Sequence, residues 1–257
     1  KTAYEMTCRD WRSDVCSSDL IESKNAKYNK LKSINPPEIM EELKSNGIAV
    51  LTSMIFGFDW HTPDEIEKDF QYLLSLKPTL SQLMLYSPCP QTPLFDRMKQ
   101  ENRLLDIPYK LYDGLHLLFS HPHYSPEDME KLIFRLIERE NEELGPCIFR
   151  VLEIQLNGYE KLKESENPLF KRRSEEHLKQ CHLYYPLLRT GINKAPSEKV
   201  KKYLIELKDR VENSISIPKT AKAIQFAVPL LYHFTNFKNR VFPVEQPKTE
   251  VKRFNYA

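Results

Sequence analysis

Glycine is scarce in this chain, which has six glycines against eighteen prolines in 257 residues. Globular proteins normally contain about 7% glycine, so few points of this chain suit a left-handed backbone or the close approach of another group. Each glycine is therefore more informative than usual. The glycine in "SMIFGFDWH" (53–61) ends an apolar run and precedes polar side chains, so it could mark either a packing turn or the rim of a binding site.

Paired cysteines, long apolar runs and an excess of one charge are also lacking. The five cysteines have neither CxxC nor CxxxCxxC spacing, which argues against a disulfide framework and favours a reduced, cytoplasmic setting. No apolar run approaches the roughly 18 residues of a membrane span, so we do not expect an integral membrane protein. The formal net charge of +2 provides no field that would attract nucleic acid, and we expect no nucleic-acid partner.

The first twenty residues, "KTAYEMTCRDWRSDVCSSDL", show neither a helical nor a strand period. They resemble the translated sequencing-adapter segments found at the ends of metagenomic gene predictions, with "SDVCSSDL" as the recognisable part. A natural but unstructured tail is the alternative. We expect residues 1–20 to be non-biological, which discounts Cys8 and Cys16, and we expect the natural protein to extend upstream of Ile21.

The segment 21–118 alternates helical and strand patterns. Helices are predicted at 36–46, after Thr62, and at 93–102, and apolar strands at 47–58 and 80–87. "TPDE" at 62–65 is a capping box with proline at the first helical position. This order predicts an α/β fold with parallel strands.

The segment 119–257 has a different pattern and is expected to be mainly α-helical. A helix is predicted after Ser125, and others at about 147–164, 168–183 and 197–213. No element is assigned beyond 213, where prolines and aromatic residues mix. Its place after the α/β segment makes this helical region a candidate for closing the mouth of a barrel.

Polar loops follow both predicted strands, at 57–61 and at 87–93. Ligands of parallel α/β sheets bind where the carboxyl ends of strands meet helix N-termini, so both loops are expected to lie on one rim. Gly57 would allow a ligand to approach the backbone, and the prolines of "SPCPQTP" make a rigid edge that suits a flat heteroaromatic ring. The alternative is that Gly57 only relieves a turn and Asp59 caps it locally.

The histidines of "GLHLLFSHPHY" (114–124) suggest a second site. Together with Asp59 and His61 they could bind the metal of a barrel hydrolase, although their spacing matches none of the familiar zinc motifs. Loop or core histidines are the alternative. Cys147 and Cys181 fall within helical patterns and are expected to be small core residues.

Three stretches taken together resemble the second half of the radical S-adenosylmethionine (SAM) core of cobalamin-binding radical SAM proteins. They are "IESKN" (21–25), "NGIAVLTSMIFGFDWHTPDEIEKDFQYLLSLKPT" (46–79) and "LMLYSPCPQTPLFDRMKQENRL" (83–104). The later "DGLHLLFSHPHYSPEDMEKL" (113–132) and "LGPCIFRVLEIQLNGYEKLKESENPLFKRR" (144–173) resemble that family's C-terminal extension. The resemblance implies that 21–118 is the remnant of a partial (βα)6 barrel and 119–257 the extension.

The resemblance also implies where SAM would bind. Residues at the ends of the fourth, fifth and sixth barrel strands lie near its ribose and methionine or its adenine. Two positions depart from the family pattern. Ser53 replaces the first glycine of the family's GxIxG-type motif, and Asp59 stands where many relatives have a Gly-Glu turn, so the resemblance implies contacts with SAM less directly for these two residues. The matching positions are Glu22, Ser23, Ser53, Ile55, Gly57, Asp59, Tyr86, Ser87 and Pro88.

Relatives of this kind cleave SAM reductively to a 5′-deoxyadenosyl radical, using a [4Fe–4S] cluster held by CxxxCxxC, and many use cobalamin to transfer a methyl group. Neither the cluster cysteines nor a cobalamin domain occurs in this sequence, so we expect the chain alone to be inactive and to bind no metal. The resemblance implies a full-length enzyme with a small-molecule or lipid substrate and a flavodoxin- or ferredoxin-like electron donor. A non-catalytic helical interaction module is the alternative, besides the metal hydrolase.

Overall fold

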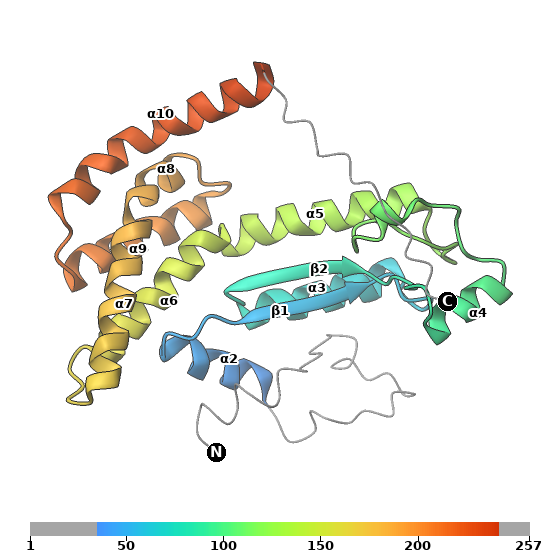
Figure 1. Ribbon diagram of the computed structural model, residues 1–257, viewed down its shortest axis with the longest axis horizontal. Coiled ribbons are helices and arrows are strands. Elements are labelled where there is room, and N and C mark those ends of the chain that lie inside the picture. Colours follow the sequence, from blue (N-terminus) through green and yellow to red (C-terminus); the bar gives the residue numbers. More distant parts are fainter. Residues whose placement is uncertain (1–34, 242–257) are drawn as a thin grey trace, which may run out of the picture.

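A computed structural model describes residues 35–241, a mainly helical α/β arrangement (Figure 1). Cys8, Cys16, Glu22 and Ser23 lie outside these residues. The first elements are α2 (Pro36–Ser45), β1 (Leu51–Phe56), α3 (Pro63–Leu76), β2 (Leu80–Leu85), α4 (Pro93–Gln100), the 3-10 helix η2 (Tyr109–Leu111) and α5 (Pro126–Leu144). They are followed by α6 (Cys147–Leu162), α7 (Pro168–Tyr184), η3 (Tyr185–Leu187), α8 (Leu188–Asn193), α9 (Glu198–Ser214) and α10 (Lys219–Val241).

The two strands pair in parallel, with Leu51 opposite Leu80 and Phe56 opposite Leu85. The predicted α/β class with parallel strands is therefore confirmed for this region. In the described part of the chain the sheet has only these two strands. Two strands do not define a barrel, so the partial (βα)6 barrel stays a prediction.

Among residues 35–241, one face of this sheet is covered by helices and the opposite face is only partly covered. Side chains alternate between the two faces of a strand, and Met54 and Phe56 point into a core shared with α3 and α5. The opposite face carries Leu51, which is 49% exposed, and then Ser53 and Ile55. Main members of the covered core are Met54, Phe56, Ile66, Phe70, Leu73, Leu83, Leu85, Met98, Leu117, Phe119, Met129, Ile133 and Leu136.

Local capping explains where several helices begin. Thr62 and Glu65 form the predicted capping box of α3, and Ser125 accepts a hydrogen bond from the Asp128 N–H at the start of α5. Helix α3 ends where Lys77 adopts a left-handed conformation, with φ 45°. The helices predicted from 147, 168 and 197 occur as α6, α7 and α9 with bounds shifted by at most two residues.

A second hydrophobic core lies among α6 to α10. It contains Leu152 and Leu156 of α6, Tyr185 of η3, and Leu204 and Leu207 of α9. The two cores divide near Gly145, because α5 packs into the first core. The domain ranges 21–118 and 119–257 stay a prediction, since a division between cores does not by itself define a domain.

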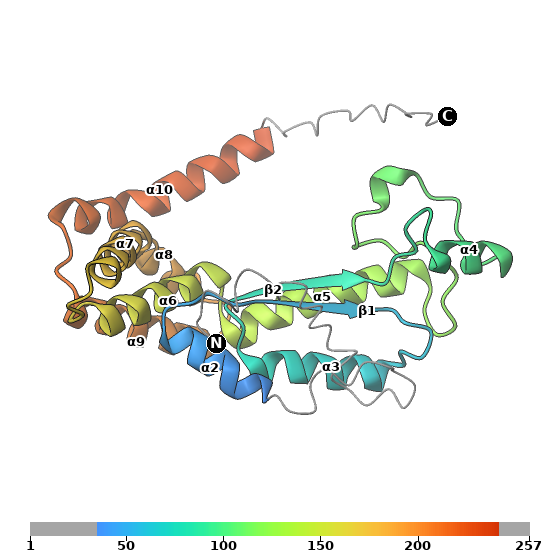
Figure 2. The same ribbon diagram turned by 60° about the horizontal axis from the view of Figure 1, so that its bottom comes forward.

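Helices α6 to α9 do not lie over the carboxyl ends of the strands. Figures 1 and 2 show α6 to α9 beyond the amino ends of β1 and β2, with the arrowheads pointing away from them. Arg150 of α6 accordingly donates a hydrogen bond to the carbonyl of Pro78, two residues before β2, with an N···O distance of 2.7 Å. The expectation that these helices close the mouth is wrong for α6 to α9.

Two further sequence expectations need correction. The strand predicted at 47–58 is shorter, because Gly47 forms a turn with φ 75° and Gly57 ends the strand with φ 85°. Cys147 is exposed rather than part of the core, because it begins α6, whereas Cys181 is buried as expected. Helix α10 occupies a segment to which no element was assigned. Within the described residues no helix is long and apolar enough to cross a membrane.

Candidate functional site

The carboxyl ends of β1 and β2 bring their two loops side by side. The Tyr86 N–H donates to the Phe56 carbonyl, with an N···O distance of 2.7 Å, so pairing continues one residue past each strand. The next residues are Gly57 on one side and Ser87 on the other, whose hydroxyl donates back to the Leu85 carbonyl. The parallel register alone brings these loops to one edge of the sheet.

Gly57 has a structural role at this edge. Its φ of 85° disfavours any residue with a Cβ atom, yet a Cβ would meet nothing closer than the Met129 Cε at 3.7 Å. The Gly57 N–H donates to the Nδ1 atom of His61 at 3.1 Å, which closes the turn onto α3. The turn therefore accounts for this glycine, and its predicted approach to an adenosyl group stays a prediction.

Aromatic rings line the edge between the two loops. Phe58 stacks on Trp60, with ring centroids 4.6 Å apart and planes 9° apart, and also packs on Tyr86 at 4.5 Å. Tyr86 in turn meets Phe119 edge-on. Trp60 is 53% exposed, so part of this aromatic surface is open to a planar ligand.

Ser53 and Ile55 precede this edge on the partly open face of the sheet, and both are half-buried. The Ser53 hydroxyl lies 3.2 Å from the side-chain oxygen of Gln82, its partner on β2, and Ile55 pairs with Met84. The structure thus places Ser53, Ile55 and Gly57 in line along one strand. Tyr86, Ser87 and Pro88 follow the neighbouring strand, and all six positions stay predicted cofactor contacts.

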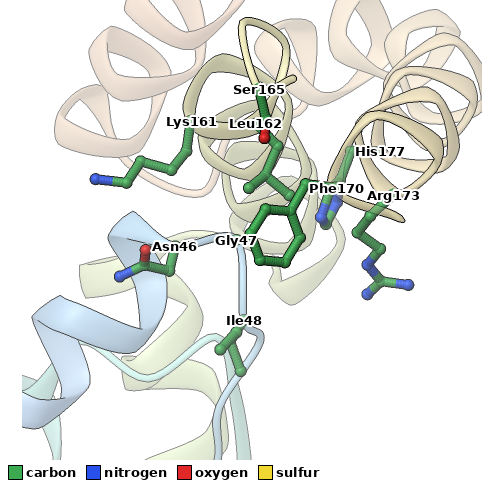
Figure 3. Close-up of a pocket in the computed structure, with 9 residues that line it drawn as sticks. All are labelled: Asn46, Gly47, Ile48, Lys161, Leu162, Ser165, Phe170, Arg173 and His177. Carbon is green, nitrogen blue, oxygen red and sulfur yellow. The ribbon is translucent and has the colours of Figure 1, made fainter. Parts of the chain in front are cut away.

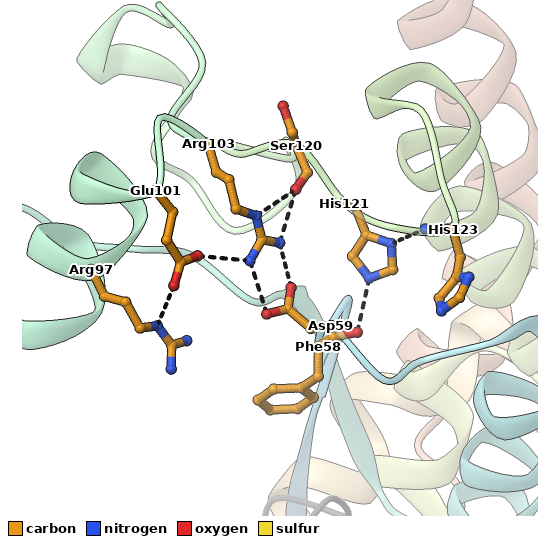
Figure 4. A network of polar contacts seen from close by, with 8 residues as sticks. All are labelled: Phe58, Asp59, Arg97, Glu101, Arg103, Ser120, His121 and His123. Atoms are coloured by element: carbon orange, nitrogen blue, oxygen red, sulfur yellow. Dashed lines mark hydrogen bonds and ion pairs between the residues drawn. The ribbon is translucent and has the colours of Figure 1, made fainter.

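Asp59 is held by an arginine that the sequence did not indicate. Arg103 donates to both carboxylate oxygens, at 3.0 Å from Nη1 and 2.5 Å from Nη2 (Figure 4). The same guanidinium donates to the Ser120 carbonyl and to Glu101. Hydrogen bonding from Arg103 holds the pKa of Asp59 below its ordinary value of 3.8. Asp59 therefore ties its loop to 101–120, and its carboxylate is engaged by an ion pair.

His121 extends this network. Its Nε2 atom lies 2.8 Å from the Phe58 carbonyl, and its Nδ1 atom lies 3.1 Å from the His123 N–H (Figure 4). A carbonyl can only accept and an N–H can only donate, so Nε2 carries the proton and Nδ1 is the acceptor. Burial lowers the pKa of His121, which favours this neutral form. His121 therefore connects the loop after β1, at Phe58, to the segment 121–123 through two hydrogen bonds.

A buried histidine–carboxylate pair lies beneath the Gly57 turn. His61 is 1% exposed and Asp69 of α3 is 3% exposed, with 3.6 Å between Nε2 and the nearer carboxylate oxygen. Burial lowers the pKa of His61 to about 4 and raises that of Asp69 to about 6. The sequence pattern could have indicated that Asp69 is buried. It lies three residues after Ile66 and four before Leu73, on the apolar face of α3.

The histidines do not converge on a metal site in this structure. Among the described residues no group of three or more His, Cys, Asp or Glu side chains is placed to hold a metal ion. His116 pairs with Asp113 at 2.9 Å, and both His61 and His121 are bonded to backbone atoms. The geometry therefore does not favour the metal-hydrolase interpretation.

Comparison with known proteins points to methyl transfer in distant relatives. The chain is 30% identical over 130 residues to bacteriochlorophyllide d C-12(1)-methyltransferase of Chlorobaculum tepidum, a match covering 48% of this chain and 26% of that protein. It is 26% identical over 105 residues to an uncharacterized methyltransferase of Pyrococcus horikoshii, covering 40% of this chain and 23% of that protein. Each match thus spans about a quarter of the relative. No family model and no solved structure matches the chain.

Proposed function

We propose that the whole protein to which this chain belongs transfers a methyl group, and that the edge formed by β1 and β2 contributes to its SAM site. Two methyltransferases are the relatives that support the reaction type. The observation that carries the site is the sheet face that the described residues leave partly open, which leads from Ser53 and Ile55 to the partly open aromatic edge at Trp60.

The residues at this edge suit the adenine end of SAM. A planar ring can stack on the exposed face of Trp60, and the face carrying Ile55 and Met84 offers apolar contact beside the Ser53 hydroxyl. SAM would supply the methyl group when bound. The contribution of this chain is to bind and orient that donor, while the Asp59–Arg103 ion pair and His121 fix the loops around it.

The more specific form of the proposal is a cobalamin-dependent radical SAM enzyme. The described cysteines do not fit a [4Fe–4S] cluster, because Cys89 and Cys147 are exposed on separate elements and Cys181 is buried. Burial raises the pKa of the Cys181 thiol to about 12, which makes it a poor ligand. In this form the cluster, the cobalamin and the electron-donor surface belong to other parts of the whole protein, and the substrate is a small molecule or lipid.

A binding experiment on the whole protein tests the site. Ser53→Tyr would place a ring on the partly open sheet face, and Ser75→Tyr makes the same change at an exposed position of α3. We expect Ser53→Tyr to weaken SAM binding at least tenfold in isothermal titration calorimetry, and Ser75→Tyr to change it less than twofold. Equal affinities in both variants would contradict the proposed site.

Product analysis and gene sequence test the reaction. Methyl transfer from SAM carrying a labelled methyl group should be detectable with the anaerobically reconstituted whole protein, after addition of iron, sulfide and cobalamin. Formation of 5′-deoxyadenosine would support the radical form, and methyl transfer without it would leave only the general proposal. A gene with no CxxxCxxC within about one hundred residues upstream of Ile21 would also exclude the radical form.

A further inference from the structure

Helix α10 carries large apolar side chains on the surface of the protein. Ile224, Phe226 and Leu230 are 50%, 58% and 71% exposed. The helix is anchored by Ala221, which is buried in the second hydrophobic core, and it packs on η3 and α8. Figures 1 and 2 both show the C-terminal half of α10 running clear of the other helices and strands. Within residues 35–241 this apolar surface therefore faces outward.

The exposed apolar positions form one face along the helix. Phe226 and Leu230 are four residues apart and lie on the same side, with the exposed Ala223 and Ala227 beside them. The same helical spacing continues this face at positions 234, 237 and 241, where the sequence has Phe, Phe and Val. The apolar face of α10 is thus opposite the side by which the helix joins the second core.

The charge of this segment differs from that of the rest of the chain. Residues 213–244 contain no Asp or Glu, although the sequence has 36 acidic residues in 257. By helical spacing, positions 222 and 240 fall beside one edge of the apolar face and position 238 beside the other. An apolar face with cations at both edges and no acid suits a partner that is apolar inside and anionic outside. The cations within α10 are Lys219, Lys222, Lys238 and Arg240.

We propose that the apolar face of α10 lies on the surface of an anionic lipid bilayer. Phe226 and Leu230 would enter it to a depth of about 5–10 Å, and the cations would contact the lipid phosphates. Arg189, whose guanidinium lies 4.1 Å from the centroid of the Phe226 ring, adds a cation beside this face. A second copy of the chain suits the face less well, because two α10 helices would bring cations together with no acidic residue to oppose them. This inference does not depend on the proposed methyl transfer.

Co-sedimentation of the full 257-residue chain with lipid vesicles tests the proposal. We expect binding to vesicles of equal parts phosphatidylglycerol and phosphatidylcholine. Binding should be at least tenfold weaker with phosphatidylcholine alone, and also weaker in high salt, which screens the attraction. Leu230→Glu should weaken binding to the anionic vesicles at least tenfold, and Lys219→Gln about fivefold. Both residues are exposed, so the unfolding temperatures of these variants should match that of the unmodified chain.

Phe170 of α7 provides a matched control. It is 52% exposed and stands between Lys161 and Arg173, which point away on opposite sides of its ring (Figure 3). It is therefore an exposed ring among cations, as in α10, but Glu164 and Glu166 precede it in the same loop. Phe170→Glu should change vesicle binding less than twofold, because this ring does not belong to an acid-free apolar face.

An exposed lysine on another helix controls for charge alone. Lys202 of α9 has a side chain that is 79% exposed, and Lys202→Gln should also change binding less than twofold. The proposal is overturned if the chain binds neither kind of vesicle, if it binds both equally, or if a control variant weakens binding as much as Leu230→Glu. Sedimentation velocity without lipid tests the other occupant. A dimer that Leu230→Glu dissociates would assign the face to a second copy and overturn the proposal.

Discussion

Gly47 and Gly158 approach each other backbone to backbone, joining the turn after α2 to α6. A Cβ on Gly47 would overlap the Cα of Gly158, and Gly47 also has φ 75°. We expect Gly47→Ala to lower the free energy of unfolding by about 3 kcal/mol, because overpacking and a left-handed backbone both add to the cost. Urea unfolding followed by circular dichroism measures it.

Gly57→Ala is the matched control for this prediction. Gly57 has a similar φ of 85° but room for a Cβ, so its alanine variant should lose only about 1 kcal/mol. If the two alanine variants unfold at the same urea concentration, the close approach of Gly47 to Gly158 does not contribute to stability as predicted.

The buried pair of Arg150 and Glu140 joins α6 to α5 beneath the sheet. Their side chains are 10% and 8% exposed, 2.6 Å separates the nearest atoms, and the Ser81 hydroxyl donates to the same carboxylate oxygen. Arg150→Met leaves a buried carboxylate with too few donors, and we expect it to cost about 3 kcal/mol. Adding Glu140→Gln should recover part of that loss, because the remaining group is then neutral. Thermal and urea unfolding of both variants measure the difference.

An exposed ion pair provides the comparison. Lys199 and Glu143 also approach to 2.6 Å, but their side chains are 66% and 51% exposed. Lys199→Met should therefore change stability by no more than about 0.5 kcal/mol. A loss for Arg150→Met as small as that for Lys199→Met would show that burial of the first pair does not matter.

The ion pair between Asp59 and Arg103 should make stability depend on acid pH. The pKa of Asp59 is lowered mainly by its hydrogen bond with Arg103, so its contribution is complete above the ordinary value of 3.8 and is lost as pH falls through the folded-state pKa. We expect Asp59→Asn to cost about 1 kcal/mol at pH 7 and clearly less in strong acid. Asp106→Asn, at an exposed position, should change stability at pH 7 by no more than about 0.5 kcal/mol. Urea unfolding at pH 7 and in strong acid measures the stability of both variants. A loss for Asp59→Asn that is the same at the two pH values would contradict the prediction.

Local chemistry made much of the fold predictable. The capping box at Thr62, the proline that follows it and the helical spacing in 147–213 depend on residues within a few positions of each other. The bounds of β1 were less predictable, because the left-handed turn at Gly47 packs on the distant Gly158, and the apolar pattern runs through Gly57 although the backbone is left-handed there. Helix α10 has Pro229 in its interior, which weakens any local helix signal.

The candidate site could be predicted only in outline. The parallel register brings Gly57 and Ser87 to one edge, as alternation of strands and helices implies. Arg103 lies 44 positions from Asp59 in the sequence, and no local pattern connects them. The sequence therefore indicated which loops meet, while the pairing that engages Asp59 depends on the packed tertiary structure.

His61 and Asp69 should oppose each other in their effect on stability between pH 4 and pH 6. Burial lowers the pKa of His61 from 6.5 to about 4, so the unfolded chain takes up a proton that the folded protein does not, and stability falls as pH drops through this range. Burial raises the pKa of Asp69 from 3.8 to about 6, so the folded protein keeps a proton, and stability rises as pH drops. The two effects therefore oppose each other in the unmodified chain.

Single variants should reveal each effect separately. Asp69→Asn leaves the histidine, so acidification from pH 6.5 to 4 should lower the free energy of unfolding by about 2 kcal/mol more than in the unmodified chain. His61→Gln keeps an acceptor for the Gly57 N–H and leaves the aspartate, so its stability should instead rise on acidification from pH 6 to 4. Urea unfolding at several pH values gives the free energy of unfolding as a function of pH. Opposite slopes for the two variants would confirm the prediction, and parallel slopes would show that His61 and Asp69 do not titrate in this range. Because His61 holds the Gly57 turn, the same variants report how firmly that turn is fixed beneath the proposed SAM edge.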